Sequence, residues 1–276
     1  MIKAFVVGHP IAHSRSPMIH GHWLREHGIA GSYERIDVAP SDFAAFLRGF
    51  AARGFAGGNV TIPHKEAAYR LVDHLTDRAR RLGAVNTLWL EDGRLHGDNT
   101  DVTGFVANLD QVLGQGWERA AAPALVVGAG GAARAVVAGL LDRGLGRVWV
   151  ANRTEGRTAD IVALDPSRVR ALPWGDLQGR LAGAGLLVNT TSLGMVGQPA
   201  LDLDLVPLRP DAVVADIVYV PLETPLLAAA RARGLRVVDG LGMLLHQAVP
   251  GFRRWFGVDP AVTAALRAPI EADIRG

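Results

Sequence analysis

Short apolar runs alternate with amphipathic stretches along nearly all of the chain, and this alternation restricts the fold more than any other feature of the sequence. Residues 4–7 and 124–127 are typical of buried strands, and each run is followed by a stretch with helical spacing. Strands and helices in regular succession are typical of α/β proteins with mainly parallel sheets. No internal repeat or low-complexity segment interrupts the pattern.

The elements that this pattern predicts fall into two groups. In the first group we expect strands at 4–7, 33–38 and 55–60, helices at 16–27 and 101–113, a helix capped by Ser41, and a hairpin formed by 85–90 and 94–97. The segment 114–123 breaks the pattern. Beyond it we expect strands at 124–127, 147–151, 185–188, 212–215 and 235–238, and helices at 132–143, 154–164, 225–233, 242–256 and 260–274. Two domains follow, the second beginning near residue 102.

Composition excludes several classes of protein. The 29 cationic residues exceed the 27 anionic ones by only two, so the chain lacks the basic excess that binds nucleic acid. Hydrophobic residues make up 49% of the 276 residues, enough to bury a large core. The N-terminal apolar run is too short for a signal peptide, and the long uncharged stretch that includes 182–201 is too polar for a membrane span. We expect a soluble, cytoplasmic protein with neither nucleic acid nor membrane as a partner.

Cysteine and histidine usage points away from metal and disulfide chemistry. The chain has no cysteine, which excludes disulfides, thiolate metal sites and cysteine nucleophiles, and fits a reducing compartment. None of the nine histidines is paired with carboxylates at the spacing of metal ligands. His20 and His22 fit a surface position better than a metal site, so we predict no metal.

A glycine-rich turn at Gly128, Ala129, Gly130 and Gly131 joins an apolar strand to a helix. A dinucleotide fingerprint requires this context, because glycines let the backbone approach a pyrophosphate while the helix N–H groups face it. Ala133 takes the third small position, where helix and strand pack closely. The alternative is a plain strand–helix turn, and the context favours dinucleotide binding.

The next predicted strand ends at Asn152, Arg153 and Thr154, with Arg157 one helical turn further on. NAD-binding sites usually carry an acid about 20 residues after the fingerprint, and neither 152 nor 153 is an acid. Arg153 instead suits bidentate hydrogen bonds to a 2′-phosphate. A solvated loop arginine is the alternative. The pattern favours NADP.

Two hydroxyl side chains, Ser14 and Ser16, stand two residues apart just before a predicted helix. Both can donate to one carboxylate. Either could equally be an ordinary helix cap. From the residues alone, the two interpretations stay open.

Lys65 ends a polar segment, 59–65, that follows a predicted strand, where α/β proteins commonly place their chemistry. All but two of the 29 cationic residues are Arg, and the other lysine is Lys3. Because Arg cannot release a proton at a usable pH and Lys can, Lys65 hints at proton transfer, with a surface lysine as the alternative. Asp101, at the start of a predicted helix, would either cap that helix or hold and tune the Lys65 ammonium.

Taken in order along the chain, the motifs resemble those of the shikimate dehydrogenase family. The segments that carry the resemblance are 10–17, 59–65, 83–87, 98–101, 128–133, 152–154, 189–195, 216–219 and 239–247. Each motif is weak alone, but the ordered set spans nearly the whole chain and is highly specific. Two residues depart from the family pattern. Gly21 stands where many relatives have Asn, and Arg15 stands between the serines where an apolar residue is common, which could alter the carboxylate end of the site.

The resemblance implies an α/β fold of two domains. An N-terminal α/β substrate-binding catalytic domain, 1–101, would be completed by C-terminal helices in 240–276 that return to it, and a Rossmann-type NADP-binding domain would span 102–239. The implied substrate-binding residues are Ser14, Ser16, Asn59, Thr61, Lys65, Asn86, Asp101, Tyr219 and Gln247. The implied cofactor-binding residues are Asp77, Gly128, Ala129, Gly130, Gly131, Ala132, Asn152, Arg153, Thr154, Arg157, Thr190, Ser192, Ile217, Gly240 and Met243.

The activity that the resemblance implies is the reversible, NADPH-dependent reduction of 3-dehydroshikimate to shikimate, in the pathway to chorismate and the aromatic amino acids. Lys65 and Asp101 would be the catalytic pair, Lys65 delivering the proton and Asp101 positioning it. The alternatives are an NAD-dependent quinate/shikimate dehydrogenase and a non-catalytic nucleotide-sensing relative, which would be expected to lack Lys65 or Asp101. A monomer and a homodimer are both compatible with the sequence.

Overall fold

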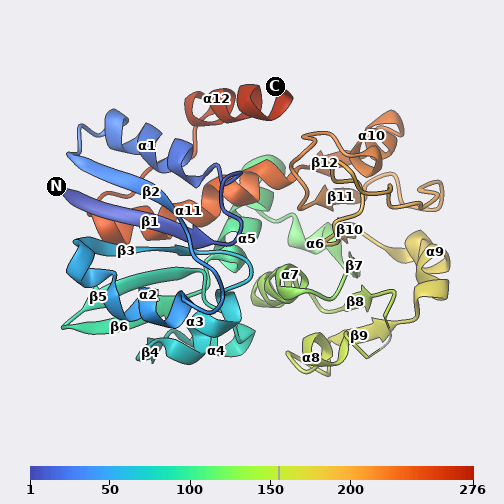
Figure 1. The fold of residues 1–276 in the computed structure, drawn as a ribbon. Coiled ribbons are helices and arrows are strands. Elements are labelled where there is room, and N and C mark those ends of the chain that lie inside the picture. The colour runs from blue at the N-terminus through green and yellow to red at the C-terminus, as the bar shows by residue number, and fades with distance from the viewer. Residues whose placement is uncertain (155) are drawn as a thin grey trace. The chain divides into compact units, whose positions relative to one another are not determined.

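The computed structural model describes residues 1–154 and 156–276, and it divides into two compact units. The first unit comprises residues 1–100 and 247–273, and the second comprises 101–246 and 274–276. Each unit contains one six-stranded sheet with helices packed beside it (Figure 1). The predicted α/β, two-domain fold class is confirmed.

The sheet of the first unit is mixed. Its strands are β1 (Ile2–Gly8), β2 (Gly31–Asp37), β3 (Phe55–Val60), β4 (His74–Leu75), β5 (Thr87–Glu91) and β6 (Arg94–Asp98), in the order β2-β1-β3-β5-β6-β4. Its helices are α1 (Ser16–Glu26), α2 (Phe43–Gly49), the 3₁₀ turn Ala51–Arg53, α3 (Lys65–Leu71), α4 (Asp77–Leu82), the later part of α11 (Gly240–Phe256) and α12 (Ala264–Arg275). β1 pairs in parallel with β2 and β3, whereas β5 and β6 form the predicted antiparallel hairpin.

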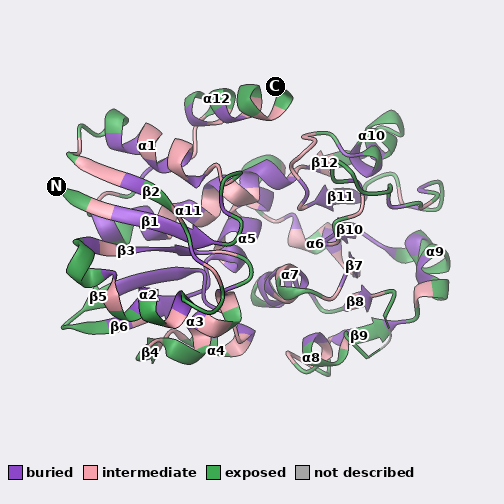
Figure 2. Cartoon of the chain, viewed as in Figure 1, coloured by how far each residue is buried: buried purple, intermediate pink, exposed green. Residues whose placement is uncertain are grey.

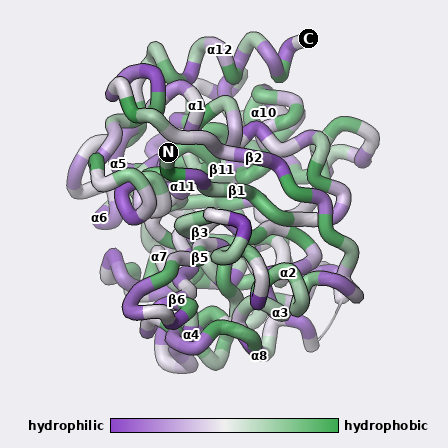
Figure 3. Tube along the Cα trace, turned by 60° about the vertical axis from the view of Figure 1, so that its left-hand side comes forward, coloured by the Kyte–Doolittle hydropathy of each residue, from purple (hydrophilic) through white to green (hydrophobic). Residues whose placement is uncertain are grey.

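Phe5 of β1 lies at the centre of this unit's core. Its ring meets those of Phe46, Phe50 and Phe55 edge-on, at centroid distances of 5.1, 5.3 and 5.3 Å. Gly58 of β3 makes room for it, because a Cβ at that position would lie 2.4 Å from the Phe5 ring. Figure 2 shows β1 and β3 buried along most of their lengths, and Figure 3 colours β1 mainly as hydrophobic.

The sheet of the second unit is entirely parallel. Its strands are β7 (Ala124–Val127), β8 (Val148–Ala151), β9 (Val169–Leu172), β10 (Leu186–Asn189), β11 (Val213–Asp216) and β12 (Arg236–Val238), in the order β12-β11-β10-β7-β8-β9. Its helices are α5 (Asp101–Leu113), α6 (Glu118–Ala121), α7 (Gly131–Asp142), α8 (Ala159–Val162), α9 (Leu177–Arg180), α10 (Pro225–Ala232), and the 3₁₀ turns Trp174–Asp176 and Leu181–Gly183. The strand order reverses beside β7, as in doubly wound dinucleotide-binding domains.

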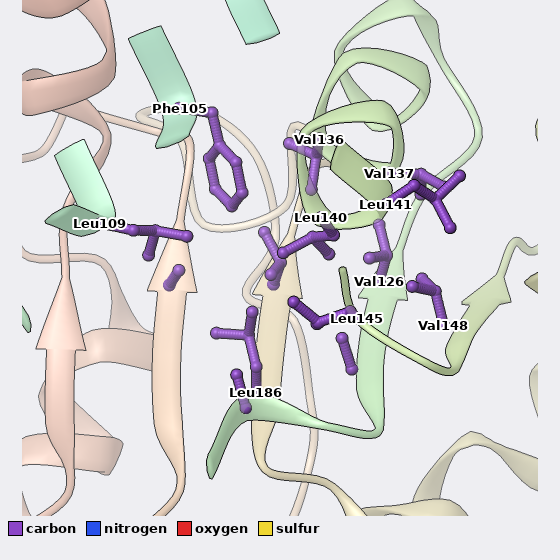
Figure 4. Close-up of a cluster of buried hydrophobic side chains, with 14 of the residues drawn as sticks. Phe105, Leu109, Val126, Val136, Val137, Leu140, Leu141, Leu145, Val148 and Leu186 are labelled. Carbon is purple, nitrogen blue, oxygen red and sulfur yellow. The ribbon is translucent and has the colours of Figure 1, made fainter. Parts of the chain in front are cut away.

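Apolar side chains from α5 and α7 form the core on one face of this sheet. Figure 4 shows Phe105, Leu109 and Leu140 gathered near the strands that contribute Val126 and Leu186. All five side chains are buried. The core therefore fixes β7 and α7, the two elements that the glycine-rich turn connects.

Two predicted helix starts are wrong, for local reasons. Ser41 does not cap a helix, because α2 begins only at Phe43, after Asp42 in helical backbone geometry. The last helix begins at Ala264 rather than at residue 260. Thr263 sets that start, since its hydroxyl accepts a hydrogen bond from an N–H of the first turn at 3.2 Å.

The helix predicted at 154–164 is also wrong. It is reduced to α8, because the backbone at Gly156 takes the left-handed geometry, with φ of 83°, before the helix begins. Part of that prediction falls on Glu155, which lies outside the described residues. The pattern also missed α3, α4, α6, α9, β4 and β9, which are too short to carry a clear period.

Candidate active site

The glycine-rich turn follows β7 in the geometry that dinucleotide binding needs. At Gly128 the backbone has φ of 114°, and a Cβ there would lie 2.5 Å from the Thr190 hydroxyl, so only glycine fits. A Cβ at Gly130 or Gly131 would meet open space. Because no side chain caps α7 at Gly130, the first N–H groups of the helix are open to an anion.

A cavity of about 360 Å³ lies beside this turn. The predicted cofactor residues that line it are Gly128, Ala129, Gly130, Asn152, Arg153, Thr154, Arg157, Thr190 and Ser192. Trp174, Gln198 and Pro199 line it as well and were missed, because they lie outside the recognisable motifs. Its volume is in the range of small-molecule sites.

The charged side chains of this cavity fit an anionic cofactor. Arg153 and Arg157 line it and are exposed, so their guanidinium groups are accessible to a phosphate. Next to Arg153, the Asn152 side-chain amide donates to the Thr154 carbonyl at 2.9 Å. Among the described lining residues there is no carboxylate of the kind that binds the ribose of NAD.

A buried polar network joins the ends of β10 and β11. The Asn189 amide donates to the Asp216 carboxylate at 3.0 Å, and the Thr224 hydroxyl donates to the same carboxylate at 2.7 Å. Burial raises the pKa of Asp216, although these hydrogen bonds oppose the rise. The network fixes the loops that follow both strands, including the segment of Thr190 and Ser192 that lines the cavity.

Other predicted cofactor residues lie outside this cavity. Gly240 approaches Ile217 so closely that a Cβ would lie 2.2 Å from the Ile217 carbonyl oxygen, and Met243 packs against the core. Gly131 and Ala132 form the start of α7. Asp77 belongs to the first unit, where its exposed carboxylate pairs with Arg80 at 2.5 Å.

The first unit contains a cluster of interlocked amides and hydroxyls centred on Asn86. The buried Asn86 side chain accepts from the Thr100 N–H at 2.8 Å and from the Thr87 hydroxyl at 2.9 Å, and it donates to the Gln247 side chain at 3.2 Å. The Thr100 hydroxyl donates to the Gln247 carbonyl at 2.9 Å. Residues from β5, from the segment after β6 and from α11 are thus brought together, among them Asn86 and Gln247 of the predicted substrate set.

Asn59, at the end of β3, is held by three hydrogen bonds. Its amide donates to the Asn86 carbonyl at 3.0 Å and to the Thr87 hydroxyl at 3.2 Å. Its oxygen accepts from the Tyr33 hydroxyl at 2.6 Å. Asn59 therefore braces the cluster.

Lys65 is the first residue of α3, and its backbone is fixed from two sides. Its carbonyl accepts the Val85 N–H at 2.9 Å. The preceding His64 is buried, stacks on Phe43 at 4.2 Å and makes a hydrogen bond to the Val38 carbonyl at 2.7 Å. Lys65 itself is half-buried.

Asp98 and Asp101, the two carboxylates of the segment 98–101, lie in different environments. Asp98 accepts from Arg78 at 2.5 Å and from Thr76 at 2.6 Å. Burial alone would raise the pKa of Asp98, but these hydrogen bonds outweigh it and lower the pKa. Asp101 is buried and opens α5, directly after Thr100 of the Asn86 cluster.

Neither serine of the predicted pair occupies the cap position of α1. That position is Arg15, whose side chain makes no capping hydrogen bond, and the helix begins at Ser16. The Ser14 hydroxyl accepts only a long hydrogen bond, 3.4 Å, from the Ser16 N–H. The helix-cap interpretation is therefore weakened, and the hydroxyl of Ser14 keeps its proton available for a ligand.

The surface position predicted for His20 is wrong. His20 is completely buried and stacks on Tyr33 at 3.9 Å, with Phe252 and Trp255 also beside it. Burial lowers the pKa of His20 to about 3, an effect that Asn59 partly offsets, so the ring is neutral at neutral pH. The sequence alone does not show this burial, because the aromatic residues of α11 that contact His20 lie far from it along the chain.

Thr61 and Tyr219 complete the predicted substrate set. Thr61 follows β3 and is fixed through its backbone, since its N–H donates to the Val7 carbonyl at 2.9 Å. Tyr219 is half-buried in the loop after β11 of the second unit.

Within residues 1–154 and 156–276, no group of three or more His, Asp or Glu could hold a metal ion. Over the same residues, no helix is both long and apolar enough to cross a membrane.

Fold and sites together define a class, an α/β protein that pairs a dinucleotide-binding unit with a unit rich in buried polar groups. Family models match three segments: a shikimate dehydrogenase substrate binding domain at 6–88, a shikimate / quinate 5-dehydrogenase at 113–195, and a shikimate 5'-dehydrogenase C-terminal domain at 240–268.

The chain is 67% identical over 276 residues to the shikimate dehydrogenase (NADP(+)) of Methylobacterium radiotolerans, covering 99% of this chain and 98% of the relative. Among solved structures, it resembles the shikimate 5-dehydrogenase from Thermus thermophilus in complex with NADP(H) and shikimate, with a TM-score of 0.86, 38% identity and coverage of 100% and 99%. It also resembles the quinate dehydrogenase from Corynebacterium glutamicum in complex with NAD, with a TM-score of 0.88, 33% identity and coverage of 98% and 99%. The chain belongs to the shikimate dehydrogenase family.

Proposed function

We propose that this protein catalyses the reversible, NADPH-dependent reduction of 3-dehydroshikimate to shikimate. One observation carries the proposal. The unit with the amide–hydroxyl cluster around Asn86, which suits a hydroxylated acid, also presents Lys65 at the start of α3. The family membership and the cavity beside the glycine-rich turn support it.

We propose NADP as the cofactor, bound by the second unit. The N–H groups at the start of α7 would hold the pyrophosphate, and Arg153 with Arg157 would hold the 2′-phosphate. Asp77, Gly240, Ile217 and the other predicted cofactor residues outside the cavity stay proposals. When bound, the reduced cofactor supplies a hydride.

We propose that the first unit binds the substrate. Ser14 and Ser16 would donate hydrogen bonds to the carboxylate, and Thr61, Asn86, Gln247 and Tyr219 would bind ring hydroxyls. For Asn86 and Gln247 the support is their mutual hydrogen bond, which fixes both side chains.

Lys65 would donate the proton that the ketone oxygen needs in reduction and remove it in oxidation. The support is chemical. A lysine can exchange a proton near neutrality, whereas the arginines, which make up nearly all the other cationic residues of this chain, cannot. Asp101 would position the Lys65 ammonium. The Lys65 carbonyl accepts the Val85 N–H, so the backbone from which this side chain extends is fixed.

In this proposal residues 1–101 with 240–276 form the substrate-binding catalytic domain and residues 102–239 the NADP domain. Because the reaction consumes NADPH, which the cell keeps in its interior, we propose a cytoplasmic location. A monomer or a homodimer would serve this chemistry equally.

The test is to follow NADPH absorbance with 3-dehydroshikimate, and then with NADH and with the quinate pair. We expect turnover with 3-dehydroshikimate and a strong preference for NADPH. An NAD-dependent quinate dehydrogenase is the second candidate, favoured by the likeness to the enzyme from Corynebacterium glutamicum. Faster turnover of quinate with NAD would replace the proposal by that candidate.

A further inference from the structure

Residues 9–16, here named the serine loop, connect β1 to α1 and contain both serines of the proposed carboxylate site. The loop has no regular secondary structure before Ser16. Within it, the Ser14 N–H donates to the Ile11 carbonyl at 3.0 Å. A loop of this kind holds two hydroxyls in register for one anion only if neighbouring elements hold the loop.

The strand β2 supplies that support from two alternate residues, Arg35 and Asp37. Arg35 Nε donates to the Ser14 carbonyl at 2.7 Å. The Asp37 carboxylate accepts from the Ile11 N–H at 3.3 Å and pairs with His9 Nδ1 at 2.6 Å.

These contacts come from one face of one strand. Tyr33, Arg35 and Asp37 are spaced by two residues, so their side chains leave the same face of β2. β2 is the edge strand of its sheet and pairs with β1. Glu34 and Ile36 point to the opposite face, where Ile36 packs against the Phe5 core.

Tyr33, a neighbour of Arg35 on the same face of β2, makes a hydrogen bond to Asn59 with a definite direction. Both amide hydrogens of Asn59 are taken by the Asn86 carbonyl and the Thr87 hydroxyl, so Asn59 can meet Tyr33 only with its oxygen. The proton of Tyr33 is therefore committed to Asn59.

A second element holds the loop from the C-terminal end of the chain. Arg15, between the two serines, pairs through its Nε with the Asp273 carboxylate of α12 at 2.8 Å. The charge of Arg15 is already matched by this carboxylate. Arg15 is thus an anchor of the loop, whereas Arg35 is the cation bonded to the backbone of Ser14 itself.

We propose that Arg35 and Asp37 are positioning residues that hold the serine loop in the conformation that recognises the substrate carboxylate. The inference rests on the proposed function, in which Ser14 and Ser16 bind that carboxylate. In the proposed site, Arg35 and Asp37 touch neither the substrate nor the cofactor. They act only on the affinity for the substrate carboxylate. Because the carboxyl group and the reacting ketone stand on different ring carbons, loss of either residue should change KM more than kcat.

The test compares shikimate with its methyl ester, which lacks the negative charge, in the variants Arg35→Met and Asp37→Ala. Each variant should raise the KM for shikimate by about five- to tenfold, the equivalent of one lost hydrogen bond, and leave kcat and the KM for NADP within about twofold. The preference for shikimate over the ester should shrink by the same factor. Arg35→Lys should recover part of this preference. Glu34→Gln, on the other face of β2, should leave the preference and the KM for shikimate unchanged.

The variant Ser14→Ala is measured under the same conditions. It distinguishes a failure of the positioning role from a failure of the proposed carboxylate site. If Ser14→Ala lowers the preference for shikimate and both strand variants keep it, the positioning role is refuted while the proposed function stands. If Ser14→Ala keeps the preference, the proposed carboxylate site is wrong, and the positioning role falls with it. A variant that loses affinity for acid and ester equally, with a lower Tm, would show general loosening and also refute the role. Combining Ser14→Ala with Arg35→Met should cost little more than Ser14→Ala alone.

Discussion

The two candidate binding regions are built on different principles. In the first unit, the site consists of buried side chains, such as Asn59, Asn86 and Thr100, that satisfy one another's hydrogen bonds. In the second unit, the cavity is shaped by backbone at Gly128 and carries its charge on exposed Arg153. One site is therefore part of the core of its unit, and the other is a surface feature laid over a complete core.

This difference predicts how each region responds to mutation. A buried amide whose partners lose their hydrogen bonds costs both stability and binding, because the partners stay desolvated and unpaired. An exposed arginine has water as an alternative partner, so its loss costs binding alone. The predictions below test this contrast, and the first concerns the chemistry itself.

Lys65→Arg should have the largest effect. The variant keeps the positive charge but cannot exchange a proton near neutrality, so kcat should fall by about 10²- to 10⁴-fold, the usual contribution of a general acid–base group. The affinity for NADP, measured by fluorescence titration, should hardly change. The matched control is Lys3→Arg, at the other lysine, which donates to the Arg53 carbonyl and lies over the Phe55 ring. Retention of most of kcat in Lys65→Arg would refute the proton-transfer role.

Asn86→Ala should show the coupling of stability and binding in the first unit. It removes a side chain that bonds to Thr87, Thr100 and Gln247 in a buried setting, so the free energy of unfolding should fall by about 2–4 kcal/mol and the KM for shikimate should rise. Ser192→Ala, an exposed residue of the other cavity, should change the free energy of unfolding by no more than about 0.5 kcal/mol. Urea unfolding of both variants measures the contrast. Equal stabilities would mean that the two regions are not built differently.

Arg153→Ala should act on cofactor choice alone. Loss of a charged pair to a 2′-phosphate corresponds to about 1–3 kcal/mol, which should raise the KM for NADP and leave that for NAD nearly unchanged. Arg147→Ala, another exposed arginine of the second unit, is the control. Steady-state kinetics gives the KM values for NADP and NAD in both variants and so tests this prediction. If the unmodified enzyme already uses both equally well, Arg153 has no role in selection.

The sequence predicted well wherever function constrains a local pattern. The helix at 101–113 and the strand at 124–127 have the observed bounds, because each has a strong period and a clear start. Three glycines between strand and helix predict the turn at Gly128, and its first three residues, 128–130, line the observed cavity. Residues 152–154 and Arg157 line that cavity too, although the helix predicted at 154–164 is reduced to α8.

The sequence did not predict the contacts between residues that lie far apart in the chain. His20 reads as a surface residue until α11 places Phe252 and Trp255 against it. Tyr33 belongs to no motif, and its hydrogen bond to Asn59 depends on the pairing of β1 with both β2 and β3. Such groupings follow from sheet order, which a single sequence specifies only through many weak preferences.

The smallest expected effect concerns acid stability. Hydrogen bonds from Arg78 and Thr76 lower the pKa of Asp98 despite its burial. A carboxyl whose pKa is lower in the folded state stabilises that state above its unfolded pKa, about 3.9, and this contribution is lost as the pH falls through the folded value. Asp98→Asn should therefore cost about 1 kcal/mol at pH 6, the net worth of one such hydrogen bond, and progressively less below pH 4.

Urea unfolding of wild-type and Asp98→Asn proteins between pH 6 and pH 3 measures this difference. The two curves of stability against pH should converge on the acid side, because the protonated carboxyl of Asp98 and the amide that replaces it are both neutral. Asp92→Asn, in the exposed turn of the β5–β6 hairpin, should run parallel to the wild type throughout. A gap between wild type and Asp98→Asn that stays constant down to pH 3 would mean that the ion pair with Arg78 contributes nothing, and that Asp98 holds the segment before Asp101 by shape alone.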